Sequence, residues 1–312
     1  MGGTGVRLSA VGLGAVEFCG GDGSRGEPTL LEASAAVTAA IASGVNWVDT
    51  AEVYYEGRNE KFLGEVLHEV GGDLLVSTKL APRPDGGGFR CEELRAACRG
   101  SLARLGRERI DVCFLHYPDE SGVLLEETWS ALGELADEGT VRAIGLSNYG
   151  IEDVERCHAI RAVDVIQDGL SLVDHLDNRA MFERCHELGI AVVVYEPLGS
   201  GTLSGRSIEQ VREAWADWSE FPFFERLLAG ENGEKSAALV AALRPIADRL
   251  GTTIPQLAIA WVLAQPGVTS AIAGSRNPEH VRHNANAATL QLAPNVLAEL
   301  EIAMSHGPTV AA

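Results

Sequence analysis

The chain has 312 residues, which is enough for about two ordinary domains or for one large α/β barrel with insertions. Hydrophobic residues make up 46% of it and charged residues 22%, proportions that exclude a disordered or fibrous protein. Acidic residues outnumber basic ones by 44 to 25, and the resulting net charge of −19 argues against nucleic acid and anionic membranes as partners.

The cysteines and the N-terminal residues indicate in which cellular compartment the protein is expected. The six cysteines include no C-x-x-C pair, so we expect reduced thiols and neither a disulfide framework nor a zinc site. The N-terminus does not combine a basic start with an apolar stretch, and no apolar run is long enough to span a membrane. We therefore expect a cytoplasmic protein without a bound metal.

Eight short apolar runs alternate with longer segments whose apolar residues recur at helical spacing, the pattern of βα units around a parallel sheet. The runs are nearly all apolar in the middle, as in strands that are covered on both faces. The predicted strands are Ser9–Ala15, Val45–Asp49, Leu74–Lys79, Asp111–His116, Val141–Ser147, Val163–Gln167, Ile190–Tyr195 and Val268–Ala273.

The segments between these runs contain residues that are typical of helix ends. Thr29 and Glu32 form a capping-box pattern, and Gly44 is placed to end that helix just before the next strand. After the last predicted strand, Asn277 and Pro278 have the properties of an N-cap and a first helical residue.

Eight units in series with no Gly/Ser linker between halves favour one closed (β/α)8 barrel, a TIM barrel formed by residues 1–312 as a single domain. The main irregular stretch runs from Gly199 to about Lys235 and shows little periodicity. We predict a long loop after the seventh strand, on the face of the barrel where active sites are built.

Reactive side chains fall at the carboxyl ends of consecutive predicted strands. Asp49 ends the second strand and is followed by Tyr54, while Lys79 ends the third and His116 ends the fourth. A phenol has an ordinary pKa of about 10, which is high for proton transfer near neutrality, and a neighbouring ammonium lowers it. Asp49 would hold the Lys79 ammonium, and His116 would hydrogen-bond a carbonyl oxygen. The alternative is a structural ion pair at the barrel rim beside a structural histidine.

Motifs along the chain resemble those of the aldo-keto reductases, in the same order and from about Arg7 to about Ala288. The segments that carry the resemblance are GVNWVDTAEVY (44–54), STK (77–79), LHYPD (115–119), VRAIGLSN (141–148), Gln167 and YEPLG (195–199). The resemblance implies that Tyr54 is the general acid for carbonyl reduction, tuned by Lys79 and Asp49, with His116 orienting the carbonyl. Tyr54 is preferred to the adjacent Tyr55 because the family places its tyrosine five residues after the aspartate.

The cofactor prediction also depends on the resemblance, since no Rossmann fingerprint is present. The family pattern implies that Ser147, Asn148 and Gln167 bind the nicotinamide carboxamide and that Tyr195 stacks on its ring. For Gln167, a buried structural amide is the alternative. The other cofactor-binding candidates are Pro197, Leu198, Gly199, Gly201, Gly274, Ser275, Arg276, His280 and Asn284.

The segment from Gly274 to Asn277 precedes a helix whose N-terminus offers free N–H groups and a positive dipole end to an adenosine 2′-phosphate. Arg276 would add a bidentate partner, unless it is a solvated surface arginine. We therefore expect NADP(H) to be preferred and NAD(H) to be possible. Many family members carry lysine at the position of Gly274 and arginine or glutamine at that of His280.

Two regions depart from the family pattern or differ among its members. The first strand of the usual N-terminal hairpin is truncated here, so the barrel floor is expected to be partly open or covered differently. Pocket residues vary among members, and for each candidate substrate contact core packing is an equal alternative. These candidates are Phe18, Tyr55, Tyr117 and Trp218.

The sequence thus predicts an NAD(P)H-dependent carbonyl reductase or alcohol dehydrogenase that acts on a small aldehyde, ketone or alcohol. The alternatives are a nicotinamide-nucleotide-sensing regulatory subunit with little turnover, and a lyase that uses Lys79 as a Schiff-base amine. Asp49 and Tyr54 disfavour the lyase because they would keep Lys79 charged. The substrate, the direction of the reaction and the choice between monomer and homo-oligomer stay open.

Overall fold

The computed structural model describes residues 3–18, 27–83, 88–174, 178–216, 219 and 222–308. Within these ranges, parallel strands close into a barrel in chain order, and β8 pairs with β1. The strands are β1 (Val11–Gly14), β2 (Trp47–Asp49), β3 (Leu75–Leu80), β4 (Ile110–Leu115), β5 (Val141–Ser147), β6 (Val165–Gly169), β7 (Ala191–Tyr195) and β8 (Val268–Gly274). Each lies within two residues of a predicted strand at both ends, so the predicted (β/α)8 barrel is confirmed.

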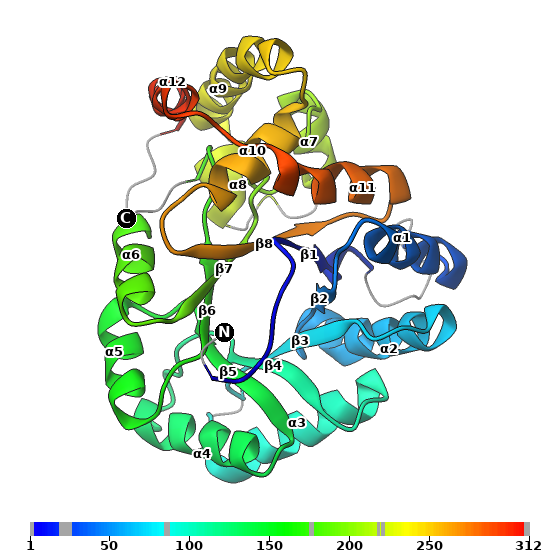
Figure 1. The fold of residues 1–312 in the computed structure, drawn as a ribbon, viewed down its shortest axis with the longest axis vertical. Coiled ribbons are helices and arrows are strands. Elements are labelled where there is room, and N and C mark those ends of the chain that lie inside the picture. Colours follow the sequence, from blue (N-terminus) through cyan, green and yellow to red (C-terminus); the bar gives the residue numbers. More distant parts are fainter. Residues whose placement is uncertain are drawn as a thin grey trace.

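Helices surround the barrel and bury their apolar faces against it (Figure 1). They are α1 (Leu30–Ala42), α2 (Arg58–Val70), α3 (Cys91–Leu105), α4 (Leu125–Asp137), α5 (Ile151–Ile160), α6 (Arg179–Glu187), α7 (Ile208–Ala214), α8 (Pro222–Leu227), α9 (Gly230–Arg249), α10 (Ile254–Leu263), α11 (Pro278–Asn286) and α12 (Pro294–Met304). Helix α1 begins with the predicted capping box of Thr29 and Glu32, and α11 begins with Asn277 as its N-cap and Pro278 in its first turn.

The segment after β7 is in the predicted place, but it is not an irregular loop. It contains α7 and α8, and α9 begins at Gly230, inside the stretch that was predicted to be a long loop. A capping box of Ser207 and Gln210 starts α7, and the rings of Trp215 and Phe223 pack edge to face with centroids 5.0 Å apart. Helices α7 and α8 have only seven and six residues, too few to show a helical period in the sequence.

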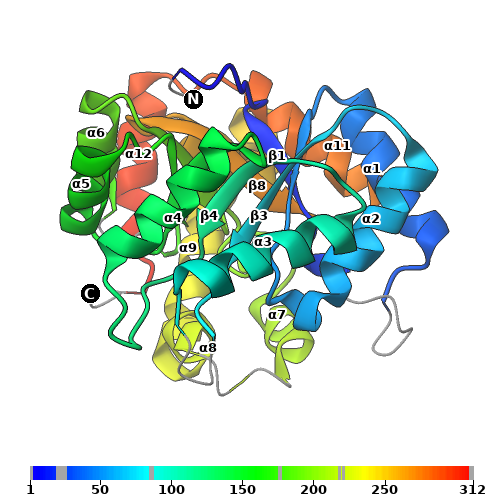
Figure 2. The same cartoon turned by 90° about the horizontal axis from the view of Figure 1, so that it is seen from below.

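The N-terminal segment covers the barrel floor without forming a strand over residues 3–10. Val6 is 1% exposed and packs with Trp47, Phe114 and Val193 inside the barrel. The Trp47 indole lies against Gly12, where a Cβ would come within 2.2 Å of the ring. Figure 2 shows the N-terminal segment at one end of the barrel and α7 and α8 at the other. The N-terminal segment therefore covers the barrel floor without a hairpin, which is one of the two predicted arrangements.

Candidate active site

The four predicted catalytic residues meet at the carboxyl end of the barrel. Asp49 is the last residue of β2, Lys79 is the last residue but one of β3, and His116 directly follows β4. Tyr54 begins a short 3-10 turn, η3 (Tyr54–Gly57), which leads into α2. Parallel strands of a barrel all end on one face, so side chains far apart in the sequence share one site.

The Lys79 ammonium is the centre of this group. Its Nζ donates hydrogen bonds to Asp49 Oδ2 at 2.6 Å, to the Thr50 carbonyl at 2.9 Å and to Tyr54 Oη at 3.4 Å. Lys79 is 1% exposed and Asp49 is 4% exposed. A buried ammonium of this kind requires the paired carboxylate, because an unpaired charge is costly to bury.

Burial and charge act in opposite directions on Lys79 and Tyr54. Burial alone lowers the pKa of Lys79, but the negative charge of Asp49 and the neighbouring Tyr54 more than offset it and leave the pKa above its usual value. Burial raises the pKa of Tyr54, and the Lys79 ammonium opposes that rise without cancelling it. The Lys79 charge therefore acts in the predicted direction, but the pKa of the Tyr54 phenol is raised overall because desolvation is the larger effect.

His116 faces Tyr54, with ring centroids 5.8 Å apart in an edge-to-face arrangement. Burial, together with the nearby Lys79 charge, lowers the pKa of His116 to about 3. Its Nδ1 is buried and has no hydrogen-bond partner among the described residues. The imidazole is therefore neutral near pH 7 and holds one ring N–H that it can donate.

Tyr54, the residue chosen over its neighbour, is the tyrosine that hydrogen-bonds Lys79. Tyr55 instead adopts a left-handed backbone with a φ of 51°. The Arg58 guanidinium lies 6.0 Å from the centroid of the Tyr55 ring, and Arg58 Nε donates to the Tyr55 carbonyl at 3.2 Å. The sharp turn after Tyr54 thus separates the two phenols.

Two further groups fix the Asp49 carboxylate. Ser77 Oγ donates to Asp49 Oδ1 at 2.6 Å, and Gln167 Nε2 donates to the same oxygen at 3.0 Å. Ser77 was not predicted, although it precedes Lys79 by two residues and strand alternation puts both on one face. Gln167 was predicted only as a cofactor ligand or a buried amide, and its contact with Asp49 joins it to the four predicted catalytic residues.

Residues predicted to bind the nicotinamide lie together at the ends of β5 and β7. Asn148 has a φ of 65°, and its Nδ2 donates to the His116 carbonyl at 2.8 Å and to Ser147 Oγ at 3.1 Å. Tyr195 Oη donates to Asn148 Oδ1 at 2.7 Å. These contacts link the group directly to the segment that holds His116.

The loop after β7 contains the next predicted residues, Pro197, Leu198, Gly199 and Gly201. Two hydroxyls that the sequence analysis did not identify follow them. Thr202 Oγ1 and Ser204 Oγ are buried, and no hydrogen bond satisfies either of them in the part of the chain that the structure describes. Buried hydroxyls are normally hydrogen-bonded, so these two depart from the usual pattern of buried polar groups.

The predicted phosphate segment lies at the end of β8 and the start of α11. Ser275 is buried and its Oγ accepts a hydrogen bond from the Asn277 amide at 3.1 Å, while Asn277 Oδ1 caps α11 by accepting from the Glu279 amide at 2.8 Å. Arg276 is exposed beside α1, where its charge acts on Glu32. His280 is exposed on α11, Asn284 is buried there, and Gly274 ends β8.

The suggested substrate contacts have different environments. Phe18 is fully buried in the apolar cluster between the barrel and α1, which fits core packing. Tyr117 is 40% exposed and its ring centroid lies 5.1 Å from that of His116, so it is close to the site. Trp218 lies outside the described residues.

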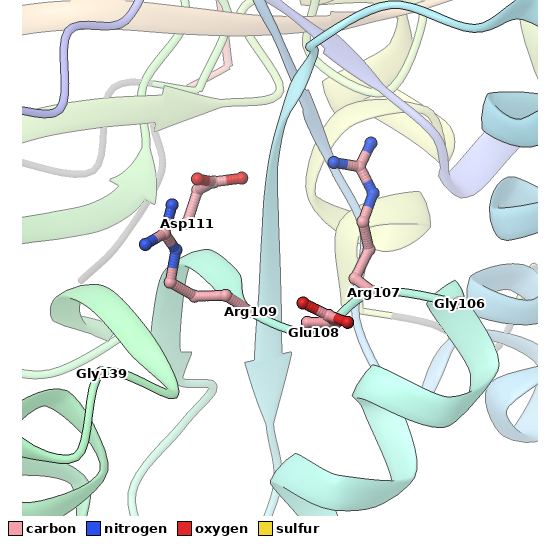
Figure 3. A pocket seen from close by; sticks show the side chains of 6 residues that line it. All are labelled: Gly106, Arg107, Glu108, Arg109, Asp111 and Gly139. Atoms are coloured by element: carbon pink, nitrogen blue, oxygen red, sulfur yellow. The ribbon is translucent and has the colours of Figure 1, made fainter.

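A shallow hollow of about 550 Å³ lies at the other end of the barrel (Figure 3). It is lined by residues that lie before or at the start of β4 and before β5, namely Gly106, Arg107, Glu108, Arg109, Asp111 and Gly139. Asp111 is held there by Arg142 at 3.0 Å and by the Val76 amide at 3.0 Å, so its charge has a structural use. This hollow is separate from the four catalytic candidates.

Two kinds of site are absent from the described residues. No group of three or more His, Cys, Asp or Glu side chains there is arranged to hold a metal ion. In the same part of the chain, none of the helices combines the length and the apolar character needed to cross a membrane.

Comparison with known proteins gives the family. The sequence model of the Aldo/keto reductase family matches residues 10–304. The structure is similar to that of the glycerol dehydrogenase AKR11B4 from Gluconobacter oxydans, with 25% identity, a TM-score of 0.84, and 100% of this chain and 96% of that chain covered. It is also similar to the thermostable aldo-keto reductase Tm1743, solved with the inhibitor epalrestat, with 27% identity, a TM-score of 0.74 and 98% of both chains covered.

The family match covers nearly the whole described barrel, and both similar structures are matched over almost their full length. The chain therefore belongs to the aldo-keto reductase family and is an oxidoreductase that depends on a nicotinamide nucleotide.

Proposed function

We propose that this protein is an NADPH-dependent carbonyl reductase in which Tyr54 is the general acid, and the general base in the reverse direction. The observation that carries the proposal is the hydrogen-bonded chain from Tyr54 through Lys79 to Asp49, with Lys79 Nζ 3.4 Å from the phenol oxygen and 2.6 Å from the carboxylate. This chain lies where barrel enzymes place their chemistry.

The proposed proton transfer follows from the charges of the site. Because burial keeps the pKa of Tyr54 high, the phenol is protonated at neutral pH and holds the proton that the substrate oxygen needs. As that proton leaves, the Lys79 ammonium stabilises the phenolate, and Asp49 keeps the ammonium in place. Neutral His116 donates a ring N–H to the carbonyl oxygen and so favours the negative charge that develops there.

The described residues fit a nicotinamide nucleotide, which supplies or accepts the hydride when it is bound. Ser147 and Asn148 would hold the carboxamide, together with Gln167, and Tyr195 would lie against the ring. The buried hydroxyls of Thr202 and Ser204, which lack protein partners in the described ranges, suit the phosphate groups. We assign the 2′-phosphate to the N-terminus of α11 and to Arg276, which supports NADPH over NADH.

For the substrate we propose a small aldehyde or ketone, or the corresponding alcohol in the reverse direction. The similar structure from Gluconobacter oxydans is that of a glycerol dehydrogenase. Glycerol, and the aldehyde and ketone formed by its oxidation, are therefore the first substrates to test.

The test begins with fluorescence titration of the protein with NADPH and with NADH, followed by turnover of an aldehyde and ketone panel. Tyr54→Phe should lower kcat by about 10²- to 10⁴-fold and leave the Kd for NADPH unchanged, because only the transferable proton is removed. Tyr149→Phe is the control, since it removes another largely buried hydroxyl, one that donates to the Tyr117 carbonyl at 2.9 Å.

Three results would count against the proposal. Wild-type protein that binds NADPH tightly but reduces no carbonyl would favour the regulatory alternative. Full turnover by Tyr54→Phe would remove Tyr54 from its role as the acid. Failure to bind either nucleotide would contradict both the enzyme and the sensor.

A further inference from the structure

The first turn of α2 lies directly behind the catalytic group and contains two polar side chains with no exposed surface, Asn59 and Glu60. Neither takes part in the chemistry proposed above. Burying an amide and a carboxylate is costly unless both are hydrogen-bonded, so their partners indicate what they hold in place.

Asn59 connects the ends of β1 and β2. Its Nδ2 donates to the Ala15 carbonyl at 2.8 Å, and its Oδ1 accepts from Thr50 Oγ1 at 2.7 Å. Thr50 follows Asp49, and its own carbonyl accepts the hydrogen bond from Lys79 Nζ at 2.9 Å. The Asn59 amide thus fixes Thr50, whose carbonyl accepts the second hydrogen bond of the Lys79 ammonium.

Glu60 connects α2 to β3 beside Lys79. Its Oε1 accepts from Thr78 Oγ1 at 2.6 Å, and its Oε2 accepts from Arg104 Nε at 2.7 Å. Strand alternation points Thr78 outward to α2 while Lys79 points to the site. Arg104 comes from the last turn of α3 and lies so close to Gly57, whose φ is 81°, that a Cβ there would be 2.8 Å from Arg104 Cδ.

The same helix end also sets the place of Tyr54. The turn η3 runs from Tyr54 to Gly57 and continues directly into α2, so Tyr54 lies five residues before Asn59. The distance of 3.4 Å from Tyr54 Oη to Lys79 Nζ is at the long end of hydrogen-bond geometry, so a small displacement would break the contact.

We propose that Asn59 and Glu60 are positioning residues for the reaction, because they hold Lys79 and Tyr54 in register from one helix end. The proposal rests on the proposed function for its kinetic consequences. Whether these side chains set the contact between Tyr54 and Lys79 is a geometric question that does not depend on turnover.

The test removes the partner hydroxyls and leaves the helix itself intact. Thr50→Val and Thr78→Val delete the groups that bind Asn59 and Glu60, while Thr50→Ser and Thr78→Ser keep a hydroxyl in place. Ser236→Ala is the control, because it removes a fully buried hydroxyl that donates to the Leu227 carbonyl at 2.7 Å, in the packing of α8 against α9.

The kinetic readout separates positioning from stability. A displacement of the acid by about 1 Å costs on the order of 10²-fold in rate, so each valine variant should lose about 10- to 100-fold in kcat. The Kd for NADPH should not change, and the serine variants should recover most of kcat. A loss no larger than in Ser236→Ala, or one that serine does not restore, would overturn the proposal.

A second readout does not require turnover. The chain has five tyrosines, and in protein labelled with [13Cζ]tyrosine the Tyr54 signal is the one that Tyr54→Phe removes. We expect this signal to move in both valine variants and to stay in place in Ser236→Ala. A signal that stays in place in the valine variants would refute the positioning role, whatever kcat does.

The two readouts also distinguish this proposal from the proposed function. If the wild-type protein reduces no carbonyl but the Tyr54 signal moves in the valine variants, the proposed function is wrong and the positioning of Tyr54 and Lys79 by α2 stands.

Discussion

Removing either charge of the Asp49 and Lys79 pair should destabilise the protein strongly, whereas removing both should cost much less. Both side chains are almost completely buried and their charged atoms are 2.6 Å apart. Lys79→Met would leave a buried carboxylate without its cation, and Asp49→Asn would leave the ammonium without its anion. Breaking a buried pair in this way costs about 3–5 kcal/mol.

The surrounding hydrogen bonds set where in that range each variant falls. In Lys79→Met, Asp49 still accepts hydrogen bonds from Ser77 at 2.6 Å and from Gln167 at 3.0 Å. In Asp49→Asn, Lys79 keeps the Thr50 carbonyl and the neutral Tyr54 hydroxyl. Hydrogen bonds to a charged group contribute about 1.5–3 kcal/mol. The two that remain on Asp49 are on average shorter than the two that remain on Lys79, which measure 2.9 and 3.4 Å. We therefore expect Lys79→Met, at about 3 kcal/mol, to be the milder variant.

The assay is urea unfolding of the wild type, the two single variants and the double variant Asp49→Asn/Lys79→Met. The free energy of unfolding lost by the double variant should be smaller than the sum of the single losses by about 3 kcal/mol or more. Arg179→Met is the control, because it breaks the exposed pair with Glu301 at 3.1 Å and should cost less than about 1 kcal/mol.

The pH dependence of the same pair has a definite sign. Because the folded-state pKa of Lys79 is raised, its contribution to stability is complete below the ordinary lysine value of about 10.5 and is lost as the pH rises through the folded value. Strictly additive single losses, or no greater alkaline sensitivity in the wild type than in the double variant, would refute this account of the pair.

Three other expectations concern single groups. His116 should stay neutral down to about pH 4, since its pKa is lowered to about 3. Its 13C signals should therefore be constant between about pH 8 and pH 5, and a titration near pH 6.5 would contradict the effect of burial. A thiol reagent should label the exposed Cys91 rapidly and Cys98 only after unfolding, because burial raises the pKa of Cys98 to about 11. Peptide mapping measures the order of labelling, and labelling of Cys98 before Cys91 would contradict this expectation. Arg276→Ala should raise the Kd for NADPH by about 10- to 100-fold and that for NADH by less than about 2-fold in fluorescence titration, and equal effects would argue against a phosphate contact.

The barrel and the shared location of the catalytic candidates followed from local sequence patterns. A parallel strand that is covered on both faces is apolar along its length, so a polar residue at its end is conspicuous, as Asp49 and Lys79 are. Since barrel strands all end on one face, placing these residues at strand ends was enough to bring them together.

The contacts between distant segments were beyond such patterns. Gln167 and Asp49 are 118 residues apart, and their hydrogen bond depends on how β6 and β2 face each other across the barrel. Asn59 and Glu60 occupy an ordinary amphipathic helix, in which polar residues are usually solvated, and only the packing of α2 behind the strand ends buries them. The net pKa direction of Tyr54 depended on the depth of burial, which motifs do not report.

The helices after β7 are joined to the rest of the molecule by polar contacts and by apolar packing, since Val211, Leu227 and Leu228 belong to the main hydrophobic core. Arg226 of α8 pairs with Asp174 in the loop after β6 at 2.5 Å, and Trp215 Nε1 donates to the Ser200 carbonyl at 2.7 Å. The floor around Val6 and Trp47 lies at the opposite end of the barrel and shares none of these residues. Segment exchange with a relative, cut after Ser200 and before Gly230, would therefore have to bring along the residues of α7 and α8 that face the core, while barrel closure and the predicted proton-transfer residues are kept. For protein engineering, the helical insertion is thus exchangeable only together with the residues on which it packs.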